Sequence, residues 1–329
     1  MRVLRPWSIP PSHLAVLAVT LLLSACGAGS PTSSAVPSPS ASAVGSAYAA
    51  GVLGLIDPGP RPCALALTPD GTAWVTLWGG GLVNIAPDGT VGEEQQLGQE
   101  PCGIAYAGAS LWVALFRESK VLQIDPRTRE ILTTIDTAGT PYDLKAGEGS
   151  VWVTDRTNVL LRLDPANGKT QASIDLGVPP AGLSVSFGGV WIANPTADSV
   201  TRVDPATNAV VATIAVCGKP TWFAEGADAV WVGCQDDASV DRIDPATNTV
   251  VATIPTDQKP NDGGVVGDTL WWPATLGASV QRIDPATNEV VASIPLDVGV
   301  SVVEPVNDEV WVLNFARPEI WRLAADAGL

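Results

Sequence analysis

From residue 51 onward the chain consists of short apolar runs separated by turn-forming residues, and this pattern returns about every 40 positions. One clear unit has runs rich in Val, Ile, Thr and Trp at 182–186, 190–194, 200–204 and 210–215, separated by Gly, Asn, Asp and Pro. Runs of this length and composition predict β-strands. Each unit therefore holds four short strands and has no room for a helix.

Three sequence markers stay in phase over the repeat, and such periodicity indicates an architecture of stacked units. The first marker is a Trp in the second strand, at spacings of 38 to 40 residues: Trp74, Trp112, Trp152, Trp191, Trp231, Trp271 and Trp311. The second is a Pro before the first strand: Pro62, Pro101, Pro141, Pro180, Pro220 and Pro260. The third is a Pro in the turn between the third and fourth strands: Pro87, Pro126, Pro165, Pro205, Pro245 and Pro285.

Strands that read Val-Trp-Val are apolar on both faces, so both faces of each sheet must be covered. Sheets stacked radially around an axis meet this requirement. The sequence therefore predicts an all-β fold, a seven-bladed β-propeller of four-stranded antiparallel blades over residues 51–329. The last unit lacks a fourth strand, and residues 52–56 stand in that phase before Pro62. We expect this N-terminal strand to complete blade seven and close the ring.

The recurring segment Ser-Val-x-Arg-Ile-Asp-Pro-Ala-Thr-Asn, followed by Val-Val-Ala-Thr-Ile, resembles the repeat of YncE-type propellers and is similar to that of the streptogramin B (virginiamycin B) lyase family. The resemblance covers residues 51–329 and rests on turn and core positions, so it guides the fold more than the activity. It implies, as an alternative function, a metal-assisted lyase or hydrolase that uses His in the central funnel. The single His, His13, lies in the leading segment. We therefore expect no catalytic residue, no metal and no cofactor.

The leading segment has the pattern of an export signal. Arg2 and Arg5 precede an apolar run over residues 14–25, which is too short to span a bilayer. The run ends in Leu-Ser-Ala-Cys, which resembles a bacterial lipobox. The resemblance implies a signal peptide over 1–25 with cleavage before a diacylated Cys26. The alternative is an ordinary secretory signal with a chance Cys. Residues 26–50 are uncharged and rich in Gly, Ser, Ala and Pro, which predicts a disordered tether. We expect a lipid-anchored protein on the bacterial cell membrane, facing outside the cytoplasm.

Charge and composition exclude several classes of function. The 34 acidic residues outnumber the 18 basic ones, for a net charge of −16, and this argues against nucleic acid as a partner. Without imidazole after cleavage, the chain has no Ser-His-Asp triad and no His general base. We expect a monomeric binding or scaffolding module whose partner is a protein, a cell-wall component or a small polar ligand.

The candidate ligand site lies at one end of the predicted ring. Loops between the second and third strands, and loops between blades, meet at this end and differ in every blade, as binding loops commonly do. At the other end the Asp-Pro-Ala-Thr-Asn turn recurs, and Arg202, Arg242 and Arg282 before it are expected to form local ion pairs or loop ties. The candidate funnel residues are Tyr142, Asp143, Trp222, Asp262, Arg117, Arg156, Gln235, Asp236, Asn314 and Arg317.

Each of these candidates has two interpretations. Asp143 and Asp262 either bind a cation through their oxygens or are solvated funnel charges. Arg117, Arg156 and Arg317 either bind a carboxylate or phosphate, or pair with Glu118, Asp155 or Asp236. Trp222 either contacts a ligand or plugs the channel.

Four cysteines remain after Cys26, and an exported domain with an even count is expected to form disulfides. Cys63 and Cys102 directly follow the repeat Pro, so they occupy equivalent positions on the innermost strands of neighbouring blades. Cys217 precedes the first strand of its blade and Cys234 ends the second, and antiparallel pairing brings these ends together. The repeat phase therefore predicts Cys217–Cys234 and Cys63–Cys102; the alternative is buried free thiols.

Overall fold

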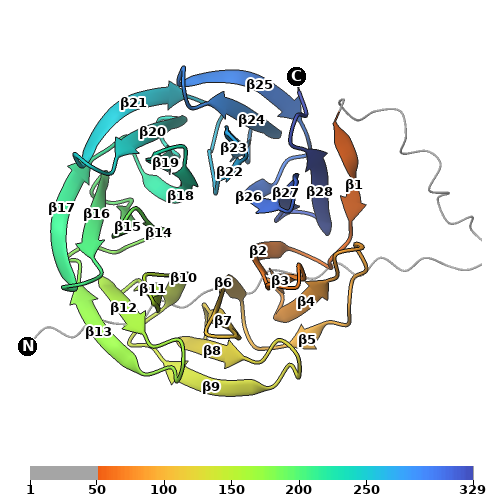
Figure 1. Cartoon of the computed structure of the whole chain (residues 1–329), viewed down its shortest axis with the longest axis vertical. Coiled ribbons are helices and arrows are strands. Elements are labelled where there is room, and N and C mark those ends of the chain that lie inside the picture. Colours follow the sequence, from red (N-terminus) through yellow and green to blue (C-terminus); the bar gives the residue numbers. More distant parts are fainter. Residues whose placement is uncertain (1–50, 329) are drawn as a thin grey trace, which may run out of the picture. The chain divides into compact units, whose positions relative to one another are not determined.

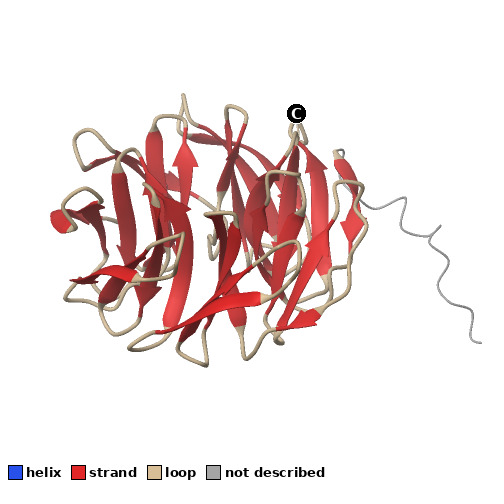
Figure 2. Cartoon of the chain, turned by 60° about the horizontal axis from the view of Figure 1, so that its bottom comes forward, coloured by secondary structure: helices blue, strands red, loops and turns tan. Residues whose placement is uncertain are grey.

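A computed structural model describes residues 51–328 of the chain. These residues form seven four-stranded antiparallel sheets arranged as a ring, without a helix in this range (Figures 1 and 2). The predicted seven-bladed β-propeller is therefore confirmed. The expected signal peptide, Cys26 and the tether lie outside the described residues. No helix in the described part is long and apolar enough to cross a membrane.

Each blade runs from an innermost strand at the axis to an outermost strand at the rim. The first four blades are β2 (Pro62–Leu67), β3 (Ala73–Leu77), β4 (Gly81–Ile85) and β5 (Gln95–Gln96); β6 (Pro101–Ala107), β7 (Ser110–Leu115), β8 (Lys120–Ile124) and β9 (Ile131–Asp136); β10 (Pro141–Gly147), β11 (Ser150–Asp155), β12 (Val159–Leu163) and β13 (Thr170–Asp175); and β14 (Leu183–Ser186), β15 (Gly189–Asn194), β16 (Ser199–Asp204) and β17 (Ala209–Ala215). The last three are β18 (Pro220–Gly226), β19 (Ala229–Cys234), β20 (Ser239–Asp244) and β21 (Thr249–Pro255); β22 (Gly264–Val266), β23 (Thr269–Ala274), β24 (Ser279–Asp284) and β25 (Glu289–Pro295); and β26 (Val300–Val306), β27 (Glu309–Asn314), β28 (Glu319–Ala324) and β1 (Val52–Ile56).

The seventh blade joins the two ends of the domain. Its outermost strand, β1, lies beside β28 (Figure 1) and pairs with it antiparallel. Leu55 lies opposite Trp321 and Ile56 opposite Ile320. Ile56 and Ile320 share a core cluster with Ile85 of blade one. The seam between the last blade and the first is therefore packed as well as hydrogen-bonded.

The repeat Trp residues form the core between blades. Trp112, Trp152, Trp191 and Trp231 are fully buried, in second strands whose neighbours are also buried. Each of these four indole nitrogens donates a hydrogen bond to the backbone carbonyl five residues earlier, in the hairpin that leads into its strand. The Trp thus fills the space between blades and satisfies its own polar atom, as a buried indole requires.

Arginines before the recurring turn connect neighbouring blades. The Nη1 of Arg202 lies 2.6 Å from the carbonyl oxygen of Pro245 and 2.7 Å from the Oδ1 of Asn248, and its guanidinium carbon lies 4.6 Å from the Trp191 ring centroid. Arg162 and Arg242 make the same contacts one blade before and one blade after. The recurring turn is therefore held by the preceding blade, which explains why that end of the ring is uniform.

Candidate functional site

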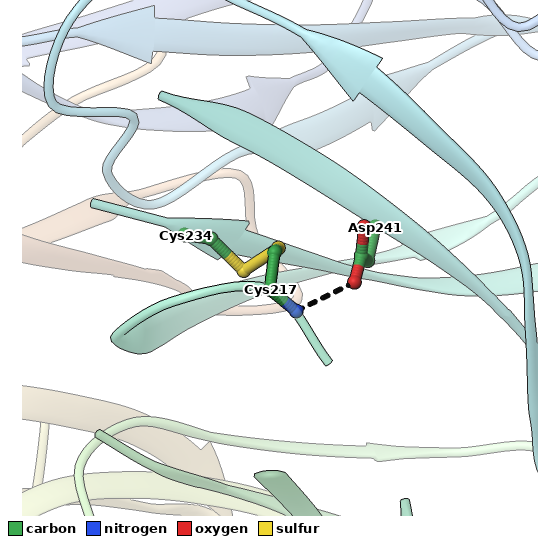
Figure 3. Close-up of side chains that lie close together, drawn as sticks. All are labelled: Cys217, Cys234 and Asp241. Carbon is green, nitrogen blue, oxygen red and sulfur yellow. Dashed lines mark hydrogen bonds between the residues drawn. A yellow bond between two sulfur atoms is a disulfide. The ribbon is translucent and has the colours of Figure 1, made fainter. Parts of the chain in front are cut away.

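Both predicted disulfides are present. Cys63 and Cys102 join β2 to β6 beside the axis, with their Cα atoms 5.2 Å apart. Cys217 and Cys234 join the loop before β18 to the end of β19, with their Cα atoms 5.6 Å apart (Figure 3). Repeat phase identified the pairing because equivalent residues of neighbouring blades, and the paired ends of antiparallel strands, must lie close together.

Asp241 lies beside the second disulfide, and Figure 3 shows the three side chains together. In residues 51–328 this is the only group of three His, Cys, Asp or Glu side chains whose potential metal-ligand atoms lie within 4.8 Å of one another. The two sulfurs are bonded to each other, and Asp241 accepts hydrogen bonds from the backbone nitrogen of Cys217, at 2.8 Å, and from Thr253. Gln281 accepts the equivalent bond from Asp257 in the next blade. The arrangement therefore holds the inter-blade loop, and its donor set does not fit a metal.

The predicted variable end of the ring holds a cavity of about 460 Å³ on the axis. Five aromatic side chains line it: Trp78, Phe116 and Phe315 from loops between second and third strands, and Tyr142 and Trp222 from the innermost strands β10 and β18. Neighbouring ring centroids along the series Phe315, Trp78, Phe116, Tyr142 and Trp222 lie 5.4 to 6.0 Å apart. Together they make a continuous aromatic wall, contributed by blades seven, one, two, three and five.

Glycine makes room for the last ring of this wall. A Cβ atom on residue 182, just before β14 of blade four, would lie 2.5 Å from the carbonyl oxygen of Thr221 and 2.7 Å from the Cε3 of Trp222, so this position requires Gly. Trp222 then stacks on Tyr142 with their ring planes 19° apart. Burial raises the pKa of the Tyr142 hydroxyl, which therefore stays protonated near neutral pH.

Two arginines stack on the wall. The guanidinium carbon of Arg61 lies 4.5 Å from the Phe315 centroid, and that of Arg156 lies 4.2 Å from the Tyr142 centroid. Each also approaches a second ring, Trp78 and Phe116 respectively. Both arginines are exposed and neither lines the cavity. Their positive charges therefore belong to the surface around the aromatic wall.

A second layer of side chains surrounds the axis next to the aromatic wall. It is formed by the residue of each inner strand that pairs with the repeat Trp. In five blades this residue is small: Ala66, Ala105, Ser184, Ala224 and Gly264. In the other two it is charged, with Lys145 opposite Trp152 and Glu304 opposite Trp311. Both charged side chains line the cavity.

Asp143 and Asp262 complete the charged layer, and their partners differ. Asp143 is 5% exposed and accepts hydrogen bonds from the backbone nitrogens of Leu144, at 2.8 Å, and of Leu183 in the next blade, at 2.9 Å. Asp262 Oδ2 lies 4.0 Å from the Nζ of Lys145. Asp143 therefore links blades three and four, whereas Asp262 forms an ion pair across the axis.

The surroundings in this layer favour the charged form of Lys145 and disfavour the charged form of Glu304. Burial by itself lowers the pKa of Lys145, but Asp262, Asp143 and Glu304 together raise it above its usual value, so Lys145 stays protonated. Burial raises the pKa of Glu304 from 4.5 to about 7, against the opposing attraction of Lys145. The Glu304 carboxylate thus titrates near neutral pH.

The structure brings part of the candidate set together at the cavity. Tyr142, Asp143, Trp222, Gln235 and Asp262 line it. Arg156 stacks on Tyr142 but does not itself line the cavity.

The remaining four candidates have structural partners instead. Arg117 pairs with Glu100 at 2.9 Å, and Arg317 pairs with Asp297 at 2.7 Å, both at the surface. The exposed Asp236 lies 3.9 Å from Lys219 and 4.0 Å from Lys259. Asn314 is fully buried and binds the backbone of Val298 and Ala316. Two of the three candidate arginines therefore pair with acidic residues, but these are Glu100 and Asp297 and not the expected Glu118, Asp155 or Asp236.

The candidate set from the sequence leaves out two charged residues of the layer and three rings of the wall. Lys145 lies two residues after Asp143 on the same strand, so period-2 alternation places it on the same face. Glu304 occupies the matching phase in the last unit, where five other units have a small residue. Trp78, Phe116 and Phe315 lie in the variable loops, but only the folded ring shows that they are neighbours.

Comparisons with known proteins support the fold. The sequence matches no protein-family model and no curated protein. Among solved structures, a chain of hydrazine synthase from Kuenenia stuttgartiensis is similar with a TM-score of 0.70 and 16% identity, over 82% of this chain and 96% of that chain. BamB from Moraxella catarrhalis is similar with a TM-score of 0.62 and 12% identity, over 80% of this chain and 82% of that one. At these identities the likeness establishes a shared β-propeller fold.

Proposed function

We propose that this protein is a lipid-anchored, extracytoplasmic binding propeller that holds a ligand in its axial cavity. The observation that carries the proposal is the aromatic wall: five rings from five blades meet around one cavity of about 460 Å³. Ligand sites are concave and mostly apolar, with a few convergent polar groups, and this cavity adds Lys145, Asp262 and Glu304 to its apolar lining.

Several observations support the extracytoplasmic and anchored part of the proposal. Two disulfides are typical of oxidising compartments. The Leu-Ser-Ala-Cys sequence ending at Cys26 supports acylation there, and several acyl chains make membrane attachment stable. The recurring Asp-Pro-Ala-Thr-Asn unit supports kinship with YncE-type propellers.

Binding is tested by screening purified protein against metal ions, cell-wall fragments and small metabolites, with melting temperature and tryptophan fluorescence as readouts. Ligands of the cavity should raise the melting temperature of the wild type and fail to do so in Trp222→Ala. Phe187→Ala is the matched control, because Phe187 is an exposed aromatic residue outside the cavity. Hits that bind Trp222→Ala and the wild type equally would contradict a ligand site in the cavity.

Anchoring is tested separately, in cells that process lipoproteins. The wild type should partition into the detergent phase after extraction, and Cys26→Ser should move to the aqueous phase. Equal partitioning of the two would contradict a lipid anchor at Cys26 and leave the cavity proposal untouched.

A further inference from the structure

We infer that the axial cavity selects an organic cation, a molecule with an apolar or aromatic body that contacts the aromatic wall and a terminal ammonium group that pairs with Glu304. The inference rests on the proposed binding function and names its ligand class. It depends on three observations: the partners of the cavity carboxylates, the balance of charge in their layer, and the chemistry of the wall.

Glu304 is the one carboxylate of this layer that lacks a partner. Both oxygens of Asp143 accept backbone hydrogen bonds, and Asp262 faces the ammonium of Lys145. Within residues 51–328, the carboxylate of Glu304 has no hydrogen bond and no ion pair, although it lines the cavity. A partly buried carboxylate without a partner is costly, and a ligand that supplies N–H donors removes that cost.

The balance of charge in the layer selects the sign of the ligand. Three carboxylates, Asp143, Asp262 and Glu304, face one ammonium, Lys145, so the cavity layer has a formal excess of two negative charges. Glu225 adds a further negative charge to the field at Glu304. Burial is the main cause of the raised pKa of Glu304, and the carboxylates of Glu225 and Asp143 add to it against the attraction of Lys145.

The wall selects the body of the ligand. Aromatic faces bind apolar groups through burial and bind ammonium groups through their negative ring faces. The cationic side chains already on this wall, Arg61 and Arg156, do not line the cavity, so they leave Glu304 unneutralised. An anionic ligand would face the excess of carboxylates, and a neutral one would leave that excess uncompensated.

Three probes of equal body and length separate these possibilities: 3-phenylpropylamine, 3-phenylpropanol and 3-phenylpropionate. Their affinities are measured at pH 8 by calorimetry on the purified protein, with the wild type, Glu304→Gln and Phe187→Ala. We expect the amine to bind the wild type at least about tenfold tighter than the alcohol, since a charge-assisted pair replaces a neutral contact. Phenylpropionate should bind most weakly.

Glu304→Gln should bring the amine to within about twofold of the alcohol. Phe187→Ala should keep the full preference. Lowering the pH from 8 to 5.5 should weaken the amine more in the wild type than in Glu304→Gln, because Glu304 gains a proton over that range. Lys145, Asp143, Glu225 and Asp262 are present in both proteins, so the difference reports on Glu304.

Other outcomes overturn the inference in distinguishable ways. Equal binding of all three probes, lost in Trp222→Ala, would refute selection of a cation and leave the proposed ligand cavity standing. Tightest binding of phenylpropionate would assign an anion instead. Binding of none of the probes would refute this ligand class. The proposed function would then be tested by the melting-temperature and fluorescence screen described above.

Discussion

Replacing Glu304 with Gln should make the folded protein more stable at pH 8, although it removes a charged residue that we assign to the binding site. Burial raises the pKa of this carboxyl from 4.5 to about 7, and Lys145 opposes that rise while Glu225 and Asp143 add to it. Each unit of difference between the folded and unfolded pKa corresponds to about 1.4 kcal/mol. The ceiling is therefore about 3.4 kcal/mol, and solvent in the cavity reduces the expected gain to about 1–3 kcal/mol.

The sign of the pH dependence follows from proton linkage. The folded state holds the Glu304 proton more tightly than the unfolded state, so between pH 4.5 and 7 it binds more protons. Stability from this group consequently falls as the pH rises through that window. The difference in unfolding free energy between the variant and the wild type should be near zero at pH 4.5 and reach its full value by pH 8.

Urea denaturation followed by tryptophan fluorescence at several pH values measures this difference. Glu309, on the neighbouring strand β27 of the same blade, provides the matched control. Arg322 and Trp311 donate hydrogen bonds to its carboxylate, and these bonds lower its pKa. Glu309→Gln should therefore lose about 1–2 kcal/mol at pH 8. A Glu304→Gln variant that is destabilised at pH 8 would show that Glu304 has a partner, and an effect that does not change with pH would show that the pKa of Glu304 is not raised on folding. Either result would refute the reasoning.

Three further predictions concern the scaffold. Arg202→Ala should lower the free energy of unfolding in urea by about 2–3 kcal/mol, because it removes charge-assisted bonds to Pro245 and Asn248 and the stacking on Trp191. As a control, replacing the exposed Arg127 with Ala should change that free energy by less than about 0.5 kcal/mol. Equal effects of the two substitutions would show that the inter-blade bonds contribute nothing. Deleting residues 52–56 should lower the melting temperature and cause aggregation, because it exposes the edge of β28; a deletion variant that melts like the intact protein would contradict a closing role for β1. Replacing Cys217 and Cys234 together with Ala should destabilise the protein by about 3 kcal/mol in the same urea assay, as expected for a bond that closes a loop of 17 residues; a loss below about 1 kcal/mol would mean that Asp241 alone holds the loop.

The fold and the disulfides could be predicted because the repeat converts sequence position into spatial position. Once the units are in phase, Cys63 and Cys102 must lie on neighbouring inner strands, whatever the details of the turns. The same reasoning placed Tyr142 and Trp222 at the start of inner strands, and both line the cavity.

The cavity residues were harder to predict because the inner strands are irregular. The strand register shifts between Pro141 and Asp143, so Tyr142 and Asp143 both line the cavity although they are adjacent in sequence. Simple alternation would place them on opposite faces. Pairing partners such as Asp297 for Arg317 come from a different loop, and the local sequence contains no signal for that contact.

The position opposite the repeat Trp connects the scaffold to the proposed function. Five blades have Ala, Ser or Gly there, and the two charged exceptions come from blades three and seven, which are not neighbours in the ring. Packing around each Trp does not require these charges, because the five other blades form the same strand pair without them. A residue that raises the free energy of the folded state and breaks the local rule is expected at a functional site. Glu304 meets both conditions, and this supports the axial layer as the place where the propeller recognises its ligand.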